Sequence, residues 1–168
     1  SPTYNIGLTS MNQGGEERDN SKFITSPNSN MMNLTTADGT TITEFSTAKE
    51  SALDTQDAGY SYPLGLASFT VSVPSGSTQT INLMYITDIK PKNVVIRKYD
   101  TAAQTYATIG NASVIEDTID GKHVLVVSYD ITDNGTLDQN ATLGVITDPV
   151  GVGIEAVGSP NTGFALRP

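Results

Sequence analysis

Apolar residues occur in this chain as short runs, each of which ends within a few residues at a turn signal. The runs are rich in Val, Ile, Thr and Tyr and cover residues 68–73, 80–86, 93–99, 106–109, 112–117, 122–129, 144–147 and 151–156. Pro, Gly, Asp and Asn separate them at residues 74–76, 100–103, 120–121 and 134–135. Because no long helical pattern intervenes, the spacing favours antiparallel strands over βαβ units. We predict an all-β fold, an antiparallel two-sheet β-sandwich.

Alternation within the runs indicates which side of a strand is buried. Phe69, Val71 and Val73 alternate with Thr70 and Ser72, so one face of this strand meets a core and the other meets water. A chain of 168 residues is long enough to bury such a core. It contains no cysteine, which excludes disulfides, thiolate metal sites and a Cys nucleophile.

A tight-turn signal lies near the start of this pattern. Asp38-Gly39 is typical of two-residue turns because Gly accepts a positive φ. Residues 34–36 and 41–45 flank it and are strand-like. We therefore predict a hairpin.

One segment carries a helix signal. Thr47 and Glu50 have the spacing of a capping box, in which the hydroxyl caps the backbone and the carboxylate reaches back. This predicts a short helix over residues 48–57, ended by Gly59, and at most one such helix in the fold.

The two ends of the chain differ from the middle. Residues 1–30 are polar, and we interpret them as an extended N-terminal arm or linker. Part of this arm could dock as a strand, because Tyr4, Ile6 and Leu8 have period-2 spacing and residues 23–24 are apolar. We predict three parts, namely the arm (1–30), the β-sandwich (31–157) and a linker with a degenerate sortase-like motif (158–168).

The charge balance restricts the partners. The formal net charge is −9, which opposes nucleic acid and anionic membranes. Charged residues make up 16% of the chain, below the roughly 25% typical of soluble domains, which suits an exported protein. No apolar run approaches the roughly 18 residues of a membrane span, and Ser1 does not begin a signal peptide.

Four segments follow one another between residues 38 and 153: DGTTITEF, YSYPLGLASFTVSVPSG, VVIRKYD and SYDITDNGTLDQNATLGVITDPVGVG. They include Tyr-Pro-Leu-Gly-Leu at Tyr62–Leu66, Lys-Tyr at Lys98-Tyr99, and Asp-Pro at Asp148-Pro149. The order of these motifs resembles the choice-of-anchor U domain of bacterial surface proteins. The segments span about two-thirds of the chain. Leu143 stands where the family has Asn.

The resemblance implies an exported bacterial domain placed upstream of a C-terminal sorting signal, with no established catalytic activity. The tail fits this implication, because Pro160, Asn161, Thr162 and Gly163 follow the sortase pattern Leu-Pro-any-Thr-Gly with Ser159 in the place of Leu. The other interpretation of this tail is a plain flexible linker. On the first interpretation the anchor itself would follow Pro168.

One loop fits the template of a calcium site. Oxygen-bearing residues occupy positions 1, 3, 5, 7 and 9 of the template, with Gly135 at position 6: Asp130, Thr132, Asn134, Thr136 and Asp138. No cation lies between Lys122 and Arg167 to neutralise the carboxylates there. Ala141 departs from the template, which has Glu at position 12. The alternative is an Asx-type turn, in which these side chains bind their own backbone. Ca²⁺ is therefore a candidate cofactor on one of two interpretations of this loop.

An enzyme would have to use carboxylates or a serine with His123, the single histidine. His123 lies in a strand-like run and reads as a tucked or rim histidine. No Gly-x-Ser-x-Gly elbow occurs, and Glu116 and Asp117 are adjacent, so in a strand they point to opposite faces. We predict no catalytic residues and no enzymatic activity.

Two other chemistries are open to the chain. Six tyrosines could stack on sugars, namely Tyr60, Tyr62, Tyr85, Tyr99, Tyr106 and Tyr129, although a cross-strand pair is the plainer account of Tyr99 and Tyr106. A Lys–Asn isopeptide crosslink could replace disulfides, with Lys98 and Asn140 as the pair to try. The alternative there is a solvated lysine on a strand.

Together these features predict a non-catalytic, extracellular domain of the bacterial cell surface, structural or adhesive, held to the envelope through a C-terminal anchor. The first alternative is a self-assembling fibre subunit in which the arm at Tyr4, Ile6 and Leu8 adds a strand to a neighbour. The second alternative is a carbohydrate-binding module. We expect no nucleic-acid partner and no membrane span.

Overall fold

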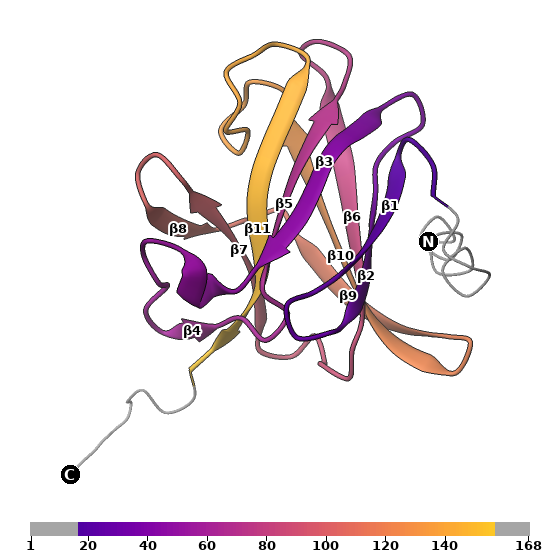
Figure 1. Cartoon of the computed structure of the whole chain (residues 1–168), viewed down its shortest axis with the longest axis vertical. Coiled ribbons are helices and arrows are strands. Elements are labelled where there is room, and N and C mark those ends of the chain that lie inside the picture. The colour runs from indigo at the N-terminus through magenta and orange to yellow at the C-terminus, as the bar shows by residue number, and fades with distance from the viewer. Residues whose placement is uncertain (1–16, 157–168) are drawn as a thin grey trace.

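A computed structural model describes residues 17–156, which form two facing antiparallel sheets (Figure 1). The elements are β1 (Ser21–Thr25), β2 (Met31–Thr35), β3 (Thr41–Ala48), η1 (Glu50–Ala52), β4 (Tyr60–Ser61), β5 (Leu66–Ser72), β6 (Thr78–Ile86), β7 (Val94–Asp100), β8 (Thr105–Thr108), β9 (Ser113–Ile119), β10 (Lys122–Thr132) and β11 (Val145–Glu155). The predicted all-β class with two antiparallel sheets is confirmed.

The strand order shows how the chain alternates between the two layers. One sheet has the order β1-β2-β6-β10-β9, and the other has β3-β5-β11-β7-β8 with β4 added against β11. Sequential strands therefore often lie in different sheets, as in other two-sheet folds with crossing connections. The longest strands, β10 and β11, lie inside their sheets and provide the two inner faces that meet.

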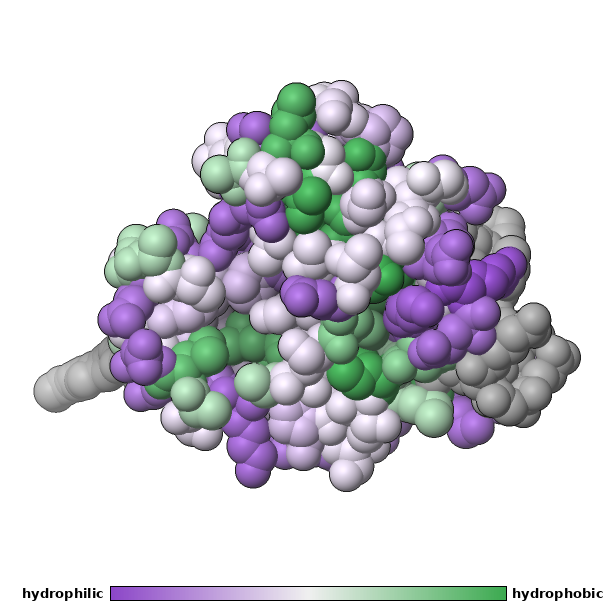
Figure 2. All heavy atoms as spheres, turned by 45° about the horizontal axis from the view of Figure 1, so that its top comes forward, coloured by the Kyte–Doolittle hydropathy of each residue, from purple (hydrophilic) through white to green (hydrophobic). Residues whose placement is uncertain are grey.

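The core lies between the sheets. Phe69 and Val71 of β5 are buried as their alternation predicts, and β11 and β10 contribute Ile146 and Leu125 among others. The inner faces carry large apolar side chains, whose burial supplies most of the stability of such a fold. A second, smaller cluster gathers Met84, Val124 and Val126 on the other face of the β6–β10 pair. On the face drawn in Figure 2, apolar residues form separate patches between polar ones.

The predicted hairpin at Asp38-Gly39 is wrong. Gly39 does adopt a positive φ of 88°, so the local turn forms. The flanking strands nevertheless do not pair, because β2 pairs with β6 and β3 pairs with β5 in the opposite sheet. The turn at residues 37–40 thus carries the chain from one sheet to the other.

The predicted helix over residues 48–57 is also wrong. Strand β3 continues to Ala48, and only the short 3₁₀ segment η1 follows. Thr47 does not cap it, since its hydroxyl donates to the carbonyl of Thr25 at 3.3 Å. Glu50 reaches forward instead of back, and its Oε2 accepts the backbone N–H of Asp57 at 2.6 Å.

The runs at residues 144–147 and 151–156 form a single strand, β11, which continues through Pro149. Pro149 is tolerated inside the sheet because pairing with β7 begins only at Val150, while β5 pairs along residues 145–151. The domain also starts earlier than residue 31, since β1 is part of the predicted arm and pairs with β2.

Residues 1–16 of the predicted arm and the whole predicted linker (158–168) lie outside the described residues. This applies to Tyr4, Ile6 and Leu8 and to the sorting motif at Pro160, Asn161, Thr162 and Gly163. Within residues 17–156, no helix has the length and apolar character needed to span a bilayer.

Candidate functional site

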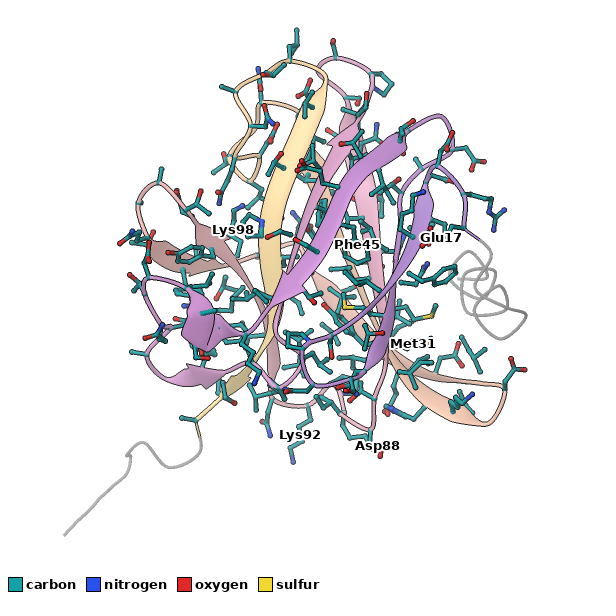
Figure 3. All side chains as sticks on the ribbon, in the orientation of Figure 1. Glu17, Met31, Phe45, Asp88, Lys92 and Lys98 are labelled. Atoms are coloured by element: carbon teal, nitrogen blue, oxygen red, sulfur yellow. The ribbon has the colours of Figure 1, made fainter. Side chains whose placement is uncertain are left out.

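A buried polar centre lies between the two sheets. Lys98 of β7 donates from Nζ to Oδ1 of Asp148 on β11 at 2.5 Å and to the carbonyl of Leu137 at 2.6 Å. Tyr129 of β10, in the other sheet, donates its hydroxyl proton to Oδ2 of Asp148 at 2.6 Å. Lys98 is 7% exposed, Tyr129 2% and Asp148 0%. Figure 3 shows Lys98 beside β7 and β11, whereas Lys92 points out from the lower end of the molecule.

Burial perturbs the acid–base properties of this centre. Desolvation raises the pKa of Asp148 to about 6, and the nearby Lys98 and the Tyr129 hydroxyl oppose this rise. Desolvation and the neighbouring Asp148 also raise the pKa of Tyr129 well above its ordinary value. Asp148 thus holds its proton more readily than an exposed aspartate does.

The loop between β10 and β11 covers the centre. Asp138 accepts three backbone N–H groups, from Asn134 at 2.9 Å, from Asn140 at 2.9 Å and from Thr147 at 3.0 Å. These bonds fix the loop against β11, so that the carbonyl of Leu137 faces Lys98. The loop is therefore part of the site and not only a connection.

The residues of the predicted calcium site lie in this loop and at its start, but their oxygens have other partners. Asp130 accepts the hydroxyl of Thr80 at 2.7 Å, and Thr132 shares a hydrogen bond with Thr78 at 2.7 Å. Asn134 and Asp138 form the loop bond given above. Within residues 17–156 no group of three or more His, Asp or Glu side chains converges on one point. The bonds are those of an Asx-type loop, and calcium binding stays a prediction, as does the role of Thr136.

Asp133 joins this loop to the turn before β6. It is 4% exposed, and its Oδ2 accepts the backbone N–H groups of Gly76 at 2.8 Å and Gly144 at 2.7 Å. Its own N–H donates to the carbonyl of Ser77 at 2.9 Å. One carboxylate oxygen thus satisfies N–H groups from two separate turns, which a neutral residue would do less strongly.

A second polar cluster forms around Arg97, the neighbour of Lys98 in β7. Arg97 donates from Nε and Nη2 to the two oxygens of Asp57 at 2.8 and 2.7 Å, and its guanidinium stacks over the ring of Tyr60 at 4.2 Å. Tyr62 donates to Oδ2 of Asp57 at 2.5 Å. Desolvation and the Asp57 carboxylate raise the pKa of Tyr62 above its ordinary range, so its hydroxyl keeps its proton. This cluster holds the loop before β4 against the sheet.

The tyrosines proposed as a sugar platform are mostly packed inside. Tyr62, Tyr85, Tyr99 and Tyr129 are buried, and Tyr60 and Tyr106 are half-buried. The predicted cross-strand pair is confirmed, since Tyr99 and Tyr106 are register partners with ring centroids 4.8 Å apart. Carbohydrate binding stays a prediction that these tyrosines do not support.

His123 lies at the edge of the β10–β9 pair. Its Nε2 contacts Oε1 of Glu116 at 2.7 Å, and its Nδ1 contacts the carbonyl of Thr87 at 2.5 Å. Both ring nitrogens therefore face acceptors, an arrangement that only the doubly protonated ring satisfies fully. The Glu116 contact and the Thr87 carbonyl raise the pKa of His123. The arrangement is that of a rim histidine in an ion pair.

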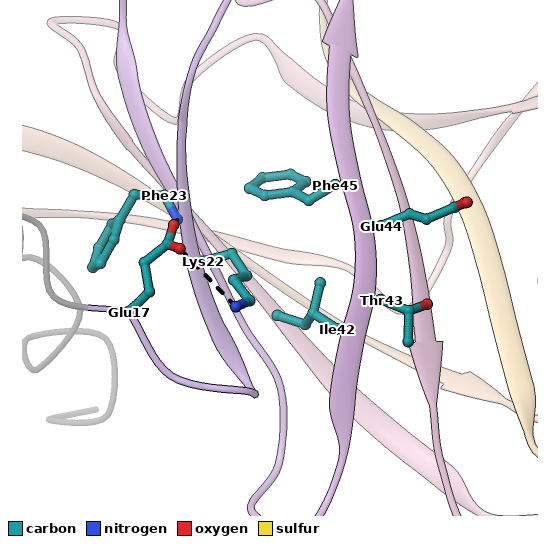
Figure 4. A pocket seen from close by; sticks show the side chains of 7 residues that line it. All are labelled: Glu17, Lys22, Phe23, Ile42, Thr43, Glu44 and Phe45. Atoms are coloured by element: carbon teal, nitrogen blue, oxygen red, sulfur yellow. Dashed lines mark hydrogen bonds and ion pairs between the residues drawn. The ribbon is translucent and has the colours of Figure 1, made fainter.

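A groove lies between the edge strands β1 and β3 (Figure 4). It has a volume of about 220 Å³, and Phe23 and the Lys22–Glu17 pair line its β1 side. A β-bulge after Ile42 turns Ile42 and Phe45 toward it and Glu44 away. Its two glutamates therefore do not face each other, as a carboxylate pair acting on one bond would have to.

The seam between β1 and β3 is bridged at both ends. The N–H of Ile42 donates to the carbonyl of Asp19 at 2.8 Å, and the Thr47 hydroxyl reaches Thr25. The open edges at the other side of the sandwich are β8 and β9, and Ile115 of β9 is 47% exposed. The absence of enzymatic activity stays a prediction.

Sequence reasoning missed the partner of Lys98. Asn140 is not that partner, because its Nδ2 donates to the Thr147 hydroxyl at 3.1 Å. A signal was nevertheless present, since Lys98 shares strand parity with Ile96, and Asp148 shares it with Ile146. Period-2 counting therefore places both charges on buried faces. The solvated-lysine interpretation of Lys98 is wrong.

Comparison with models of known families, with curated proteins and with solved structures finds no match in any of the three. The resemblance to the choice-of-anchor U domain thus depends on the order of the motifs in this chain, and it stays a prediction.

Proposed function

We propose that this chain is a non-catalytic domain of the bacterial cell surface that serves outside the cell as a rigid structural or adhesive unit. One observation supports this most directly. The buried charged side chains all have structural partners: Asp148 binds Lys98 and Tyr129 on neighbouring strands, whereas Lys98, Arg97, Asp57 and Asp133 fix loops to the sheets. Fixed loops suit a protein exposed to proteases, because cleavage requires local opening of the chain.

Composition supports the same proposal. The chain has few charged residues for its length, a net charge of −9 and no cysteine, as expected of an exported polar domain that does not depend on disulfides. The resemblance to the choice-of-anchor U domain supports display through a sorting signal.

The location is tested by labelling intact source cells with a membrane-impermeant amine reagent. Lys92 is exposed and should be labelled in intact cells, whereas the buried Lys98 should stay unlabelled in the folded protein. Labelling of Lys92 only after cell lysis would contradict the proposal.

A second candidate function is strand addition in a fibre, with the arm of one copy pairing with β9 of the next. It is supported by the exposed seven-residue edge of β9 and its exposed Ile115, because unpaired edges accept added strands. The donor would be the period-2 segment at Tyr4, Ile6 and Leu8.

This candidate is tested by sedimentation of the full chain. Ile6→Asp with Leu8→Asp should abolish assembly, and Ile115→Asp should do the same from the acceptor side. Asn5→Asp with Thr9→Asp adds the same charges at positions of opposite parity and should leave assembly in place. A monomeric wild-type chain at high concentration would remove the fibre idea.

A further inference from the structure

The polar centre at Lys98 brings an amine and a carboxyl group together inside the sandwich, where the side chains of Lys98 and Asp148 are 8% and 0% exposed. Nζ of Lys98 lies 2.5 Å from Oδ1 of Asp148, in one of the shortest contacts of the described residues. The two residues are fifty positions apart and sit on the neighbouring strands β7 and β11. Removing two charges from water costs free energy. A reaction that converts the buried ion pair into a neutral product would remove this cost.

We propose that Lys98 and Asp148 condense to an intramolecular isopeptide bond between Nζ and Cγ, with release of one water molecule. The proposal goes beyond the surface role given above and does not depend on it. A chain with no such bond would leave that role in place.

The reaction is balanced without any co-reactant. A proton moves from the Lys98 ammonium to the Asp148 carboxylate within their hydrogen bond, which gives an amine and a carboxylic acid. The amine then attacks Cγ, the Nζ–Cγ bond forms, and the Cγ–Oδ2 bond breaks. Oδ2 leaves as water with two of the three protons that Nζ carried at the start. No group is oxidised or reduced.

The surrounding groups suit each step. Tyr129 donates its hydroxyl proton to Oδ2, the oxygen that leaves, and regains a proton when water departs. Oδ1, which faces Nζ, stays as the amide oxygen. The carbonyl of Leu137 accepts a second Nζ proton and orients the nitrogen. The raised pKa of Asp148 favours the neutral acid that the reaction needs.

Proximity and dryness decide whether an amide can form in this way. Groups held at near-attack distances of about 3–3.5 Å reach effective molarities of about 10⁵–10⁸ M, enough to drive reactions that fail between free solutes. Asp148 is fully buried, so bulk water has little access to hydrolyse the amide once it forms. The bond would connect β7 to β11 covalently, as a disulfide does in other exported domains.

The test is intact mass of the full chain under denaturing conditions, with peptide mapping. The wild-type chain is expected to be lighter than its sequence by one water, and a peptide containing Lys98 should be joined to one containing Asp148. Lys98→Arg keeps the positive charge but should restore the full mass. Lys92→Arg, at an exposed lysine, should leave the loss of water unchanged.

Two further variants test whether Asp148 is the bonded partner and whether Tyr129 assists the reaction. Asp148→Asn should form the same bond with loss of ammonia in place of water, and peptide mapping should again join Lys98 to position 148, which separates this product from cyclisation at Asn134-Gly135. Tyr129→Phe should lower the fraction of linked chains in freshly purified protein.

Two outcomes would overturn the proposal. One is a wild-type chain of full linear mass after prolonged incubation in the folded state. The other is a loss of water that persists in Lys98→Arg, because cyclisation at Asp38-Gly39 or Asp120-Gly121 also releases water.

Discussion

Arg97 and Asp57, forty residues apart, form a two-bonded ion pair in which Nε donates to Oδ2 at 2.8 Å and Nη2 to Oδ1 at 2.7 Å. The Arg97 side chain is 14% exposed and that of Asp57 6%. This pair fixes the loop before β4 to the centre of β7. Parallel bonds of this kind are stronger and more specific than a single charged contact.

Arg97→Lys is expected to destabilise the fold, because lysine keeps the charge but loses the planar pair of donors. Loss of one charged hydrogen bond and of the stacking on Tyr60 should lower the free energy of unfolding by about 2 kcal/mol. Urea unfolding followed by circular dichroism measures it. Lys90→Ala is the control, since its contact with Glu116 is exposed and should contribute little to stability. Equal effects of the two variants would contradict the assignment.

Gly65 is expected to tolerate no side chain. Its φ is +72°, and an added Cβ would lie 2.7 Å from the Pro27 ring and 2.8 Å from the carbonyl oxygen of Ala48. Gly65→Ala should lower the free energy of unfolding by about 3 kcal/mol, from backbone strain and overpacking together. Gly39→Ala has the same strain with no neighbour within 4 Å, and should cost about 1 kcal/mol. Thermal melts of both variants separate the two causes.

Asp138 should stabilise the loop over the polar centre without any metal. Asp138→Ala leaves three backbone N–H groups without their carboxylate partner and is expected to lower stability by about 2–3 kcal/mol. The measurement is a thermal melt in EDTA and again in excess CaCl₂. The same loss in both solutions means that hydrogen bonds hold the loop. A wild-type melting temperature that rises with calcium, and a variant that does not respond, would establish the metal site.

The contact between His123 and Glu116 predicts a measurable pH dependence. The hydrogen bond that His123 donates to the Glu116 carboxylate raises the pKa of His123, and the same contact lowers the pKa of Glu116. The stabilising effect of the charged histidine is therefore complete below its unfolded pKa of about 6.5 and is lost as the pH rises through its folded pKa. The effect of Glu116 is complete above its unfolded pKa and is lost as the pH falls through its folded pKa.

Titration of the His123 ring by NMR provides a direct readout, since the chain has one histidine. Its pKa should lie above 6.5 in the wild type and fall in Glu116→Gln, with the Thr87 carbonyl still holding part of the shift. Lys90, the other charged group that acts on His123, lowers its pKa, so Lys90→Ala should raise it. Asp38→Asn, which lies in the turn between β2 and β3, should leave it unchanged.

Several features of the molecule followed from local pattern alone. Alternation in residues 68–73 placed Phe69 and Val71 in the core, and the short turn after residue 100 paired Tyr99 with Tyr106. These features depend on neighbours two residues apart or across one tight turn, where backbone geometry leaves few choices. Local patterns of the same kind also predicted the all-β class.

Partners that lie far apart in the chain were decided by the order of strands in the sheets. The Asp38-Gly39 turn formed as its sequence demands, yet it joins two sheets because β2 pairs with β6 and β3 with β5. Glu50 accepts the backbone N–H of Asp57 because the chain forms the short η1 segment and not the expected helix. Strand alternation places Lys98 and Asp148 on buried faces of their strands, but only the pairing of β7 with β11 puts the amine against the carboxylate. Local sequence determines which face a side chain occupies, whereas its partner depends on which strands meet, and that is a property of the whole packed chain.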